Sequence, residues 1–237
     1  MLKIENLSVT YPDKTRGVTE VNLTVHSGEN VALIGANGAG KTSLIMALVG
    51  ILPAEGSVFL EDLKLEKKTV GEIRRRIGVV FQNPDDQLFM PYVKNDIAFG
   101  LHHIGEQERE ERIDACLKRL HIEHLKEKSA LKLSGGEKRM AALAGVLVME
   151  PSLMLFDEPT AFLDPKARRT LIGVLKSIDQ AKLIATHDLT FAAEVCERAV
   201  LMKEGGVFAD GPAKDLLYNE RLMEDCGVEA IQRYERI

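Results

Sequence analysis

The sequence contains little that would support a secreted, disulfide-built protein. Among its 237 residues are only three cysteines, and Cys116, Cys196 and Cys226 lie far apart. An odd, widely spaced set of this kind argues against a disulfide framework and indicates a reducing compartment. The first residues, Met1 to Glu5, are too polar for a secretory signal.

Long apolar runs are also missing. No stretch approaches the ~18–20 consecutive apolar residues that a membrane-spanning helix needs. We therefore expect a soluble, cytoplasmic protein. If the protein acts at a membrane, another chain must supply the membrane span.

Positive charge is sparse as well. The formal net charge is −5, and the one basic block that stands out is Arg74-Arg75-Arg76. A general nucleic-acid binder needs a clustered positive face, so the sequence predicts no nucleic-acid partner. Hydrophobic residues make up 45% and charged residues 28%, which is ordinary for a globular protein, and the length permits a sizeable core.

Hydrophobic patterning predicts an α/β fold. Residues 31–34 form a continuous apolar run, as in a strand buried on both faces of a parallel sheet. Similar runs recur at 77–81, 153–156 and 183–185. Spaced or alternating apolar residues at 2–9 and 21–25 predict N-terminal strands, and from about 84 to 150 the apolar spacing is helical. The sequence thus predicts one domain, residues 1–237, with a helical subdomain inserted at about 84–150.

Three local signals mark the boundaries of elements. Thr69 and Glu72 have the spacing of a capping box and predict the start of a short helix. Asp164, followed by Pro165, predicts the start of another helix with Asp164 as its N-cap. Gly205-Gly206 lies between two apolar segments and predicts a β-hairpin.

A glycine-rich loop follows the apolar run at 31–34. It matches the phosphate-loop pattern G-x-x-x-x-G-K-[ST] in full, with Gly35, Ala36, Asn37, Gly38, Ala39, Gly40, Lys41 and Thr42, and Ser43 after them. Glycines let backbone N–H groups wrap around phosphate oxygens where the next helix begins. We expect Lys41 to reach the β- and γ-phosphates and Thr42 to ligate Mg²⁺. The loop alone does not distinguish ATPases from GTPases or small-molecule kinases.

Two carboxylates, Asp157 and Glu158, end the apolar run at 153–156. Ligands bind at the carboxyl ends of parallel strands. Neighbouring strand residues point to opposite faces, but a turn at the end of the strand would bring both carboxylates to one site. We expect Asp157 to hold Mg²⁺ through water and Glu158 to polarise the attacking water.

The run Leu133-Ser134-Gly135-Gly136-Glu137 precedes a further apolar helix. Ser134 and Glu137 have capping-box spacing, so this helix N-terminus is oriented and suits an anion. Together, the phosphate loop, this signature run and the acidic pair resemble the ATP-binding-cassette ATPases, over essentially the whole chain. The resemblance implies an N-terminal antiparallel β subdomain and a helical signature subdomain beside a nucleotide-binding core. It also implies that each signature run contacts the ATP of a second subunit.

Four further positions fit this family. Tyr11 stands where the family places an aromatic ring under adenine, although ordinary packing is an alternative. Gln82 resembles the glutamine that contacts Mg²⁺ and the attacking water, and His187 resembles the histidine that contacts the γ-phosphate. Asp164 matches the loop that communicates across the dimer. Phe162 departs from the pattern, because the family often has a small residue there.

The segment after Gln82 indicates a branch of the family. It consists of Asn83, Pro84, Asp85, Asp86, Gln87, Leu88 and Phe89. This segment resembles one in the ATPases of energy-coupling-factor importers, where it forms a short helix near the coupling surface for the transmembrane subunit. Within that branch the chain is most similar to cobalt and nickel uptake ATPases. A vitamin transporter and a generic importer ATPase are the alternatives.

Other kinds of cassette ATPase fit less well. A DNA-repair or chromosome ATPase would need a long coiled coil between Gln82 and Ser134, for which the sequence has no room. Translation factors usually carry two cassettes, and a small-molecule phosphotransferase would not need the signature run. We expect an ATP- and Mg²⁺-dependent ATPase at the cytoplasmic side of the cell membrane. Its partners would be transmembrane transporter subunits and a second copy of the chain or a similar ATPase.

Overall fold

A six-stranded sheet forms the centre of the computed structural model, which describes residues 1–232. The strand order is β10-β9-β3-β8-β7-β6, and every pairing is parallel except that of β10 with β9. In chain order the strands are β3 (Asn30–Ile34), β6 (Ile77–Val80), β7 (Leu153–Asp157), β8 (Ala181–Ala185), β9 (Arg198–Lys203) and β10 (Gly206–Pro212). The continuous apolar runs of the sequence are therefore strands of this sheet, three in its interior (β3, β8 and β7) and one, β6, at its edge.

A second, antiparallel sheet has the order β2-β1-β4-β5. Its strands are β1 (Leu2–Thr10), β2 (Arg16–Val25), β4 (Glu55–Leu60) and β5 (Leu63–Lys64). This topology confirms the predicted α/β fold with an antiparallel N-terminal sheet.

The described residues also contain helices of two kinds. The α-helices are α1 (Lys41–Leu48), α2 (Val70–Arg76), α3 (Val93–Phe99), α4 (Glu106–Arg119), α5 (Gly135–Leu147), α6 (Pro165–Lys176), α7 (Leu189–Val195), α8 (Ala213–Leu216) and α9 (Glu220–Asp225). Short 3-10 helices are η1 (Pro84–Asp86), η2 (Glu123–Leu125) and η3 (Ala130–Lys132). In residues 1–232, no helix combines the length and the apolar character that crossing a bilayer requires.

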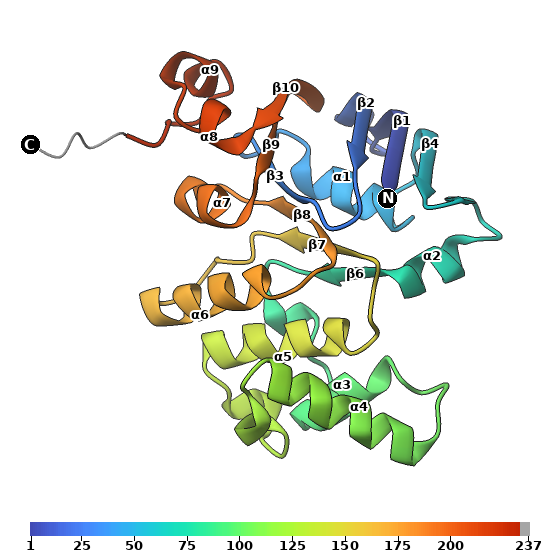
Figure 1. Cartoon of the computed structure of the whole chain (residues 1–237). Coiled ribbons are helices and arrows are strands. Elements are labelled where there is room, and N and C mark those ends of the chain that lie inside the picture. Colours follow the sequence, from blue (N-terminus) through green and yellow to red (C-terminus); the bar gives the residue numbers. More distant parts are fainter. Residues whose placement is uncertain (233–237) are drawn as a thin grey trace, which may run out of the picture.

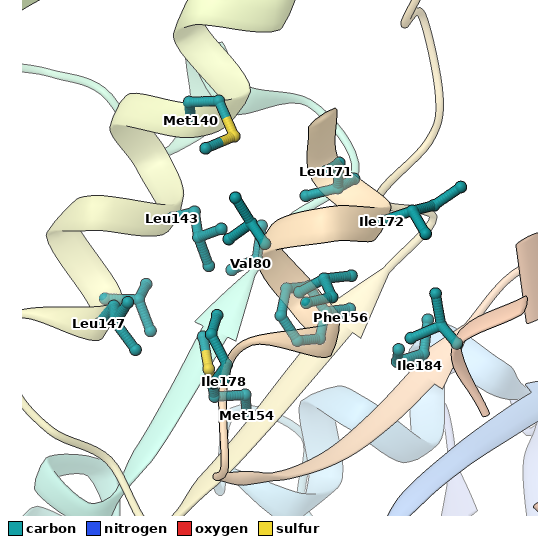
Figure 2. Packing of buried hydrophobic residues seen from close by; sticks show 14 of the residues in the cluster. Val80, Met140, Leu143, Leu147, Met154, Phe156, Leu171, Ile172, Ile178 and Ile184 are labelled. Atoms are coloured by element: carbon teal, nitrogen blue, oxygen red, sulfur yellow. The ribbon is translucent and has the colours of Figure 1, made fainter. Parts of the chain in front are cut away.

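The central sheet is buried on both faces. Along β7, Met154 and Phe156 belong to one apolar cluster, whereas Leu153 and Leu155 belong to the other, as the two-residue period of a strand dictates. Figure 2 shows the first cluster, in which side chains of α5 and α6 pack against Met154 and Phe156. The second cluster joins the sheet to α1 and the antiparallel sheet. In Figure 1, α3, α4 and α5 lie together at the opposite end of the molecule from β1, β2 and β4.

Two of the three predicted boundaries are confirmed. Asp164 accepts the N–H groups of Lys166 and Ala167, both at 2.8 Å, and so caps α6. The hairpin at Gly205 joins β9 to β10. The capping box at Thr69 is wrong, although α2 does begin there: no side-chain bond caps this helix. The Thr69 hydroxyl oxygen instead accepts the N–H of Glu66, and the hydroxyl donates to the Lys64 carbonyl. The N–H of Glu72 bonds the Thr69 backbone carbonyl, so the hydroxyl caps the preceding loop rather than the helix.

Arg139, on α5, is the largest charged side chain in the interior, with 1% of its surface exposed. Its guanidinium donates to the carbonyl oxygens of Phe81 and Gln82, in the loop just after β6. Burial lowers the pKa of Arg139 to about 10, which still leaves it charged near neutral pH. The charge is therefore held by backbone carbonyls, and these bonds fix the edge of the sheet to α5.

We predict that Arg139→Met destabilises the fold by about 2–4 kcal/mol, because two carbonyl groups lose a charged donor in the interior. Urea unfolding should show a lower midpoint with an unchanged slope. Arg221→Met, on the exposed surface of α9, is the matched control and should shift the midpoint by less than about 0.5 kcal/mol. Equal stability of the two variants would contradict this account of Arg139.

Candidate nucleotide site

A cavity of about 740 Å³ opens at the carboxyl ends of β3, β7 and β8. The phosphate loop, the acidic pair and three isolated residues predicted from the sequence, Tyr11, Gln82 and His187, meet there. Its lining comprises Tyr11, Thr15, Arg16, Gly17, Gly35 through Ser43, Gln82, Asp157, Glu158, His187, Gly227, Val228 and Glu229. Residues far apart in the chain thus converge where parallel strands end, the usual place for a ligand in such sheets.

The phosphate loop has a conformation that requires glycine. Gly38 and Gly40 have φ values of +82° and +99°, in the left-handed region. A side chain on Gly40 would collide with the backbone of Gly17, and one on Gly35 with the backbone of Met202. The loop therefore runs between two backbone segments and turns directly into α1, whose first residue is Lys41.

Lys41 is buried within this loop, with 7% of its surface exposed. Its ammonium group donates to the carbonyl oxygens of Gly35 at 2.6 Å and Ala36 at 3.2 Å. Burial lowers the pKa of Lys41, while the charges of Glu158 and Asp157 oppose that shift. The ammonium group is thus a cation held at the loop and available to a phosphate.

Thr42 and Asp157 lie side by side. The Thr42 hydroxyl donates to Asp157 Oδ2 at 2.9 Å, and burial raises the pKa of Asp157. Gln82 lines the same cavity, although β6 ends two residues before it. A hydroxyl, a carboxylate and an amide are oxygen donors of the kind that Mg²⁺ prefers, so these residues fit a magnesium ion held together with phosphate oxygens.

Glu158 turns toward the cavity because its backbone adopts φ +46°, unlike that of a regular strand residue. Both members of the acidic pair therefore line one cavity, as expected from the sequence. Glu158 Oε2 lies 2.8 Å from His187 Nδ1 and accepts the His187 backbone N–H at 3.1 Å. The His187 side chain is 67% exposed, so its ring stands in the open part of the site beside a buried carboxylate.

Tyr11 borders the same cavity from the N-terminal sheet. Its hydroxyl shares a hydrogen bond of 2.8 Å with the Ser43 hydroxyl, and a side chain on Gly17 would collide with its ring. Gly227, Val228 and Glu229 also line this cavity, and a Cβ built on Gly227 would lie 3.5 Å from the Cβ of Ala36 in the phosphate loop; the sequence patterns gave no sign of them. No motif signals them, because the packing of Met223 and Cys226 in the core, a contact between segments far apart in the chain, brings this end of the chain to the site.

The signature run lies elsewhere. Ser134 and Glu137 form the predicted capping box at the start of α5, and Leu133 is buried behind it. Ser134, Gly136 and Glu137 line a separate cavity of about 750 Å³, which also includes Asp164. The side-chain hydrogen bond from Lys128 and the Ser134 N–H lower the pKa of Glu137 to about 2, so the cap stays ionised near neutral pH.

The segment 83–89 forms the 3-10 helix η1 and its flanks. The Asn83 side chain accepts the N–H of Asp85 at 3.1 Å, Asp85 pairs with Lys138 of α5 at 2.6 Å, and Gln87 donates to the Ala142 carbonyl at 3.1 Å. Gln87, Leu88 and Phe89 line a largely apolar groove of about 600 Å³ between this segment, α3 and α5. The segment is thus held on α5, the helix that begins at the signature run, and it borders an open groove.

Comparison with known proteins identifies this arrangement. Residues 18–161 match the family described as ABC transporter. A Geobacter sulfurreducens protein, assigned by inference as an ABC transporter ATP-binding protein, is 43% identical over 97% of this chain and 93% of its own length. The energy-coupling factor transporter ATP-binding protein EcfA of Methanothermobacter thermautotrophicus is 38% identical over 94% of this chain and 74% of its own.

Two solved structures have the same fold. The protein cbiO1 of Clostridium perfringens, described as part of the ABC transporter complex cbiONQ, superposes with a TM-score of 0.85 at 37% identity, over 94% of this chain and 93% of its own. The ATP-binding cassette MJ0796, solved as a dimer with ADP and phosphate, gives a TM-score of 0.81 at 27% identity, over 90% and 99%.

The fold and the site therefore define an ATP-hydrolysing cassette. The chain belongs to the ABC transporter family, as an ATP-binding subunit of the kind that dimerises and works with transmembrane subunits.

We predict that Glu158→Gln lowers the ATP turnover number by about 10²- to 10⁴-fold, because the amide cannot take a proton from water. The affinity for ATP should change little, since the amide keeps the shape of the carboxylate. Phosphate release and the binding of a fluorescent nucleotide measure the two quantities. Glu224→Gln, on the exposed side of α9, serves as the control. Turnover near the wild-type value in Glu158→Gln would show that Glu158 is not the catalytic base.

Proposed function

We propose that this chain is the ATPase of an energy-coupling-factor type importer and powers uptake of a small solute through separate membrane subunits. The observation that carries the proposal is the segment 83–89, held on α5 beside an apolar groove. The likeness to EcfA and to cbiO1 supports the same branch. A cobalt or nickel ion is the proposed cargo, and a vitamin is the second candidate, because other subunits choose the solute.

In this proposal the cavity of about 740 Å³ binds ATP with Mg²⁺. The loop N–H groups and Lys41 hold the phosphates, and Tyr11 stacks on adenine. When bound, Mg²⁺ would supply charge neutralisation to the phosphates, held by Thr42, Gln82 and, through water, Asp157. Glu158 accepts the proton of the attacking water.

His187 contacts the γ-phosphate and holds the Glu158 carboxylate. The 2.8 Å contact between His187 Nδ1 and Glu158 Oε2 keeps the carboxylate oriented inside the open site. The ring and the backbone N–H of His187 contact the same carboxylate oxygen, so the other oxygen remains to receive the proton from water.

The signature run serves the nucleotide of a second chain. Ser134 and Gly136 line a different cavity from the phosphate loop, so one copy does not complete its own site. The capped N-terminus of α5 presents N–H groups and a positive dipole end to an anion. The partner is a second copy or a similar ATPase, and Asp164 lies in the loop that communicates between the two sites.

The apolar groove is the proposed docking place for a transmembrane subunit, and in this proposal the chain works at the cytoplasmic side of the cell membrane. Phe89 is 63% exposed and Phe99 55% exposed at its rim, which leaves aromatic surface for a partner. We also propose that residues 1–237 form one ATPase domain with its helical subdomain at about 84–150. The last five residues, 233–237, lie outside the described part of the chain.

We predict that Ser134→Arg blocks ATP-dependent dimerisation, because a long cation would fill the space that the partner's phosphates need. In a Glu158→Gln background, light scattering with Mg²⁺ and ATP should report a dimer for the parent and a monomer for the double variant. Nucleotide affinity of the monomer should stay the same. Ser27→Arg, an exposed site in the turn after β2, is the control. If the Ser134→Arg double variant still formed the dimer with ATP, the proposal that Ser134 contacts the nucleotide of a second chain would be wrong.

The membrane partner is tested by a pull-down in gentle detergent from the native membrane. The tagged wild-type chain should retain a subunit with several membrane-spanning helices. The other subunits that co-purify with it distinguish metal uptake from vitamin uptake. Asp86→Arg reverses an exposed charge in η1 and should reduce that retention at least tenfold while ATP binding stays normal. Asp62→Arg, exposed next to β5, is the control. Full retention by Asp86→Arg would argue against docking at this segment.

A further inference from the structure

One arginine joins the two segments that follow β7 and β8. Arg168, in the first turn of α6, donates from Nε to Asp188 Oδ2 at 2.7 Å and from Nη2 to Asp188 Oδ1 at 3.0 Å. The same Nη2 group donates to the Thr190 hydroxyl at 2.9 Å. Because two N–H groups meet two carboxylate oxygens, this ion pair fixes a direction as well as a distance. It ties the start of α6 to the start of α7, and both helices pack on the same face of the central sheet (Figure 1).

The ion pair is largely shielded from water. The side chain of Arg168 is 23% exposed and that of Asp188 is 22% exposed. Burial alone would raise the pKa of Asp188, but the hydrogen bonds from Arg168 and from the Phe191 backbone outweigh burial and lower that pKa below its usual value. Asp188 is therefore charged near neutral pH. Removing one partner of such a pair is costly, because the other charge is left partly buried and unpaired.

Asp188 directly follows His187, whose ring stands beside Glu158 in the nucleotide site. The Asp188 N–H donates to the hydroxyl of the buried Thr186 at 3.0 Å, and Asp188 Oδ1 accepts the Phe191 N–H at 2.9 Å. His187 thus lies between two residues whose positions are fixed. Its own side chain is 67% exposed, so packing restrains it little, and the conformation of this segment decides where the ring stands.

The segments that carry Glu158 and His187 are joined at both of their ends. At the sheet, β7 pairs with β8, and the Glu158 N–H donates to the Ala185 carbonyl at 2.8 Å. Beyond the sheet, the Arg168 N–H donates to the Asp164 carbonyl at 2.9 Å, and the Arg168 side chain bonds the residue next to His187. The ion pair therefore closes a ring of contacts that contains both Glu158 and His187.

We propose that Arg168 is a positioning residue for ATP hydrolysis: its ion pair with Asp188 holds His187 against Glu158. The proposal rests on the proposed function, in which Glu158 and His187 have their roles. Arg168 does not line the nucleotide cavity, so it acts through His187. A displacement of ~1 Å at a reacting group can lower a rate by about 10²-fold, so loss of the pair lowers turnover more than it lowers nucleotide affinity.

The first test compares R168M with R198M. Arg198 is the matched control because it forms a similar two-pronged pair with Asp210, at 24% and 34% exposure. That pair lies at the start of β9, at the end of the sheet opposite to the nucleotide site. R168M should lower kcat by about tenfold or more and change the KM for ATP by less than about twofold. R198M, assayed while it is folded, should keep the wild-type kcat, and equal kcat values for the two variants would contradict the proposal.

The second test asks whether Arg168 acts through His187. In the H187A background the ring is absent, so R168M should change single-turnover phosphate release by less than about twofold. A measurement independent of turnover uses nuclear magnetic resonance, since the sequence has only six histidines. The His187 ring resonance, assigned by its absence from the spectrum of H187A, should move in R168M and keep its position in R198M.

The outcomes separate this proposal from the proposed function. If H187A hydrolyses ATP at the wild-type rate, the role of His187 in the proposed function is wrong, and the positioning role of Arg168 falls with it. If H187A is slow but R168M lowers the rate by the same factor with and without His187, the proposed function stands and Arg168 does not act through His187. A His187 resonance that stays in place in R168M would likewise overturn the positioning role alone.

Discussion

The hydrogen bonds from Arg139 to the carbonyl groups of Phe81 and Gln82 are the constraint on which the rest of the site depends. They join α5, whose first turn is the signature run, to the loop that carries Gln82. The β6 strand itself packs on α5 through apolar side chains, and apolar contacts do not fix direction. A buried cation with backbone acceptors supplies both position and orientation, at the cost of removing a charge from water.

Helix α5 therefore contacts three functional regions through side chains or carbonyls within three turns. Its N-terminal cap faces the cavity of the signature run, Arg139 holds the Gln82 loop, and Lys138 and Ala142 hold the segment 83–87. A helix is stiff over this length, so a displacement at one of these contacts is shared by the others. In the proposed function, α5 would therefore link the docking segment to the nucleotide site.

Sequence and structure agree most closely where short-range rules act. The phosphate loop, the N-cap at Asp164 and the capping box at Ser134 each depend on a few neighbouring residues, and each forms. The capping box at Thr69 fails because the hydroxyl oxygen accepts the N–H of Glu66, in the preceding loop, and spacing does not encode that choice. Arg139 and the 227–229 lining were missed for another reason, since their roles come from contacts between segments far apart in the chain.

The polar groups of the nucleotide site already have partners within the chain. Lys41 already donates to two loop carbonyls, and Thr42 already donates to Asp157, so an incoming phosphate exchanges internal bonds for new ones. The net gain from such an exchange is modest compared with the strength of the individual bonds. In the proposed two-chain site, contacts from the signature run of the second chain would then add to the free energy of ATP binding. Glu158 has φ +46° and Phe162 has φ +62°, so the turn that carries the acidic group is itself held in a left-handed conformation at two positions.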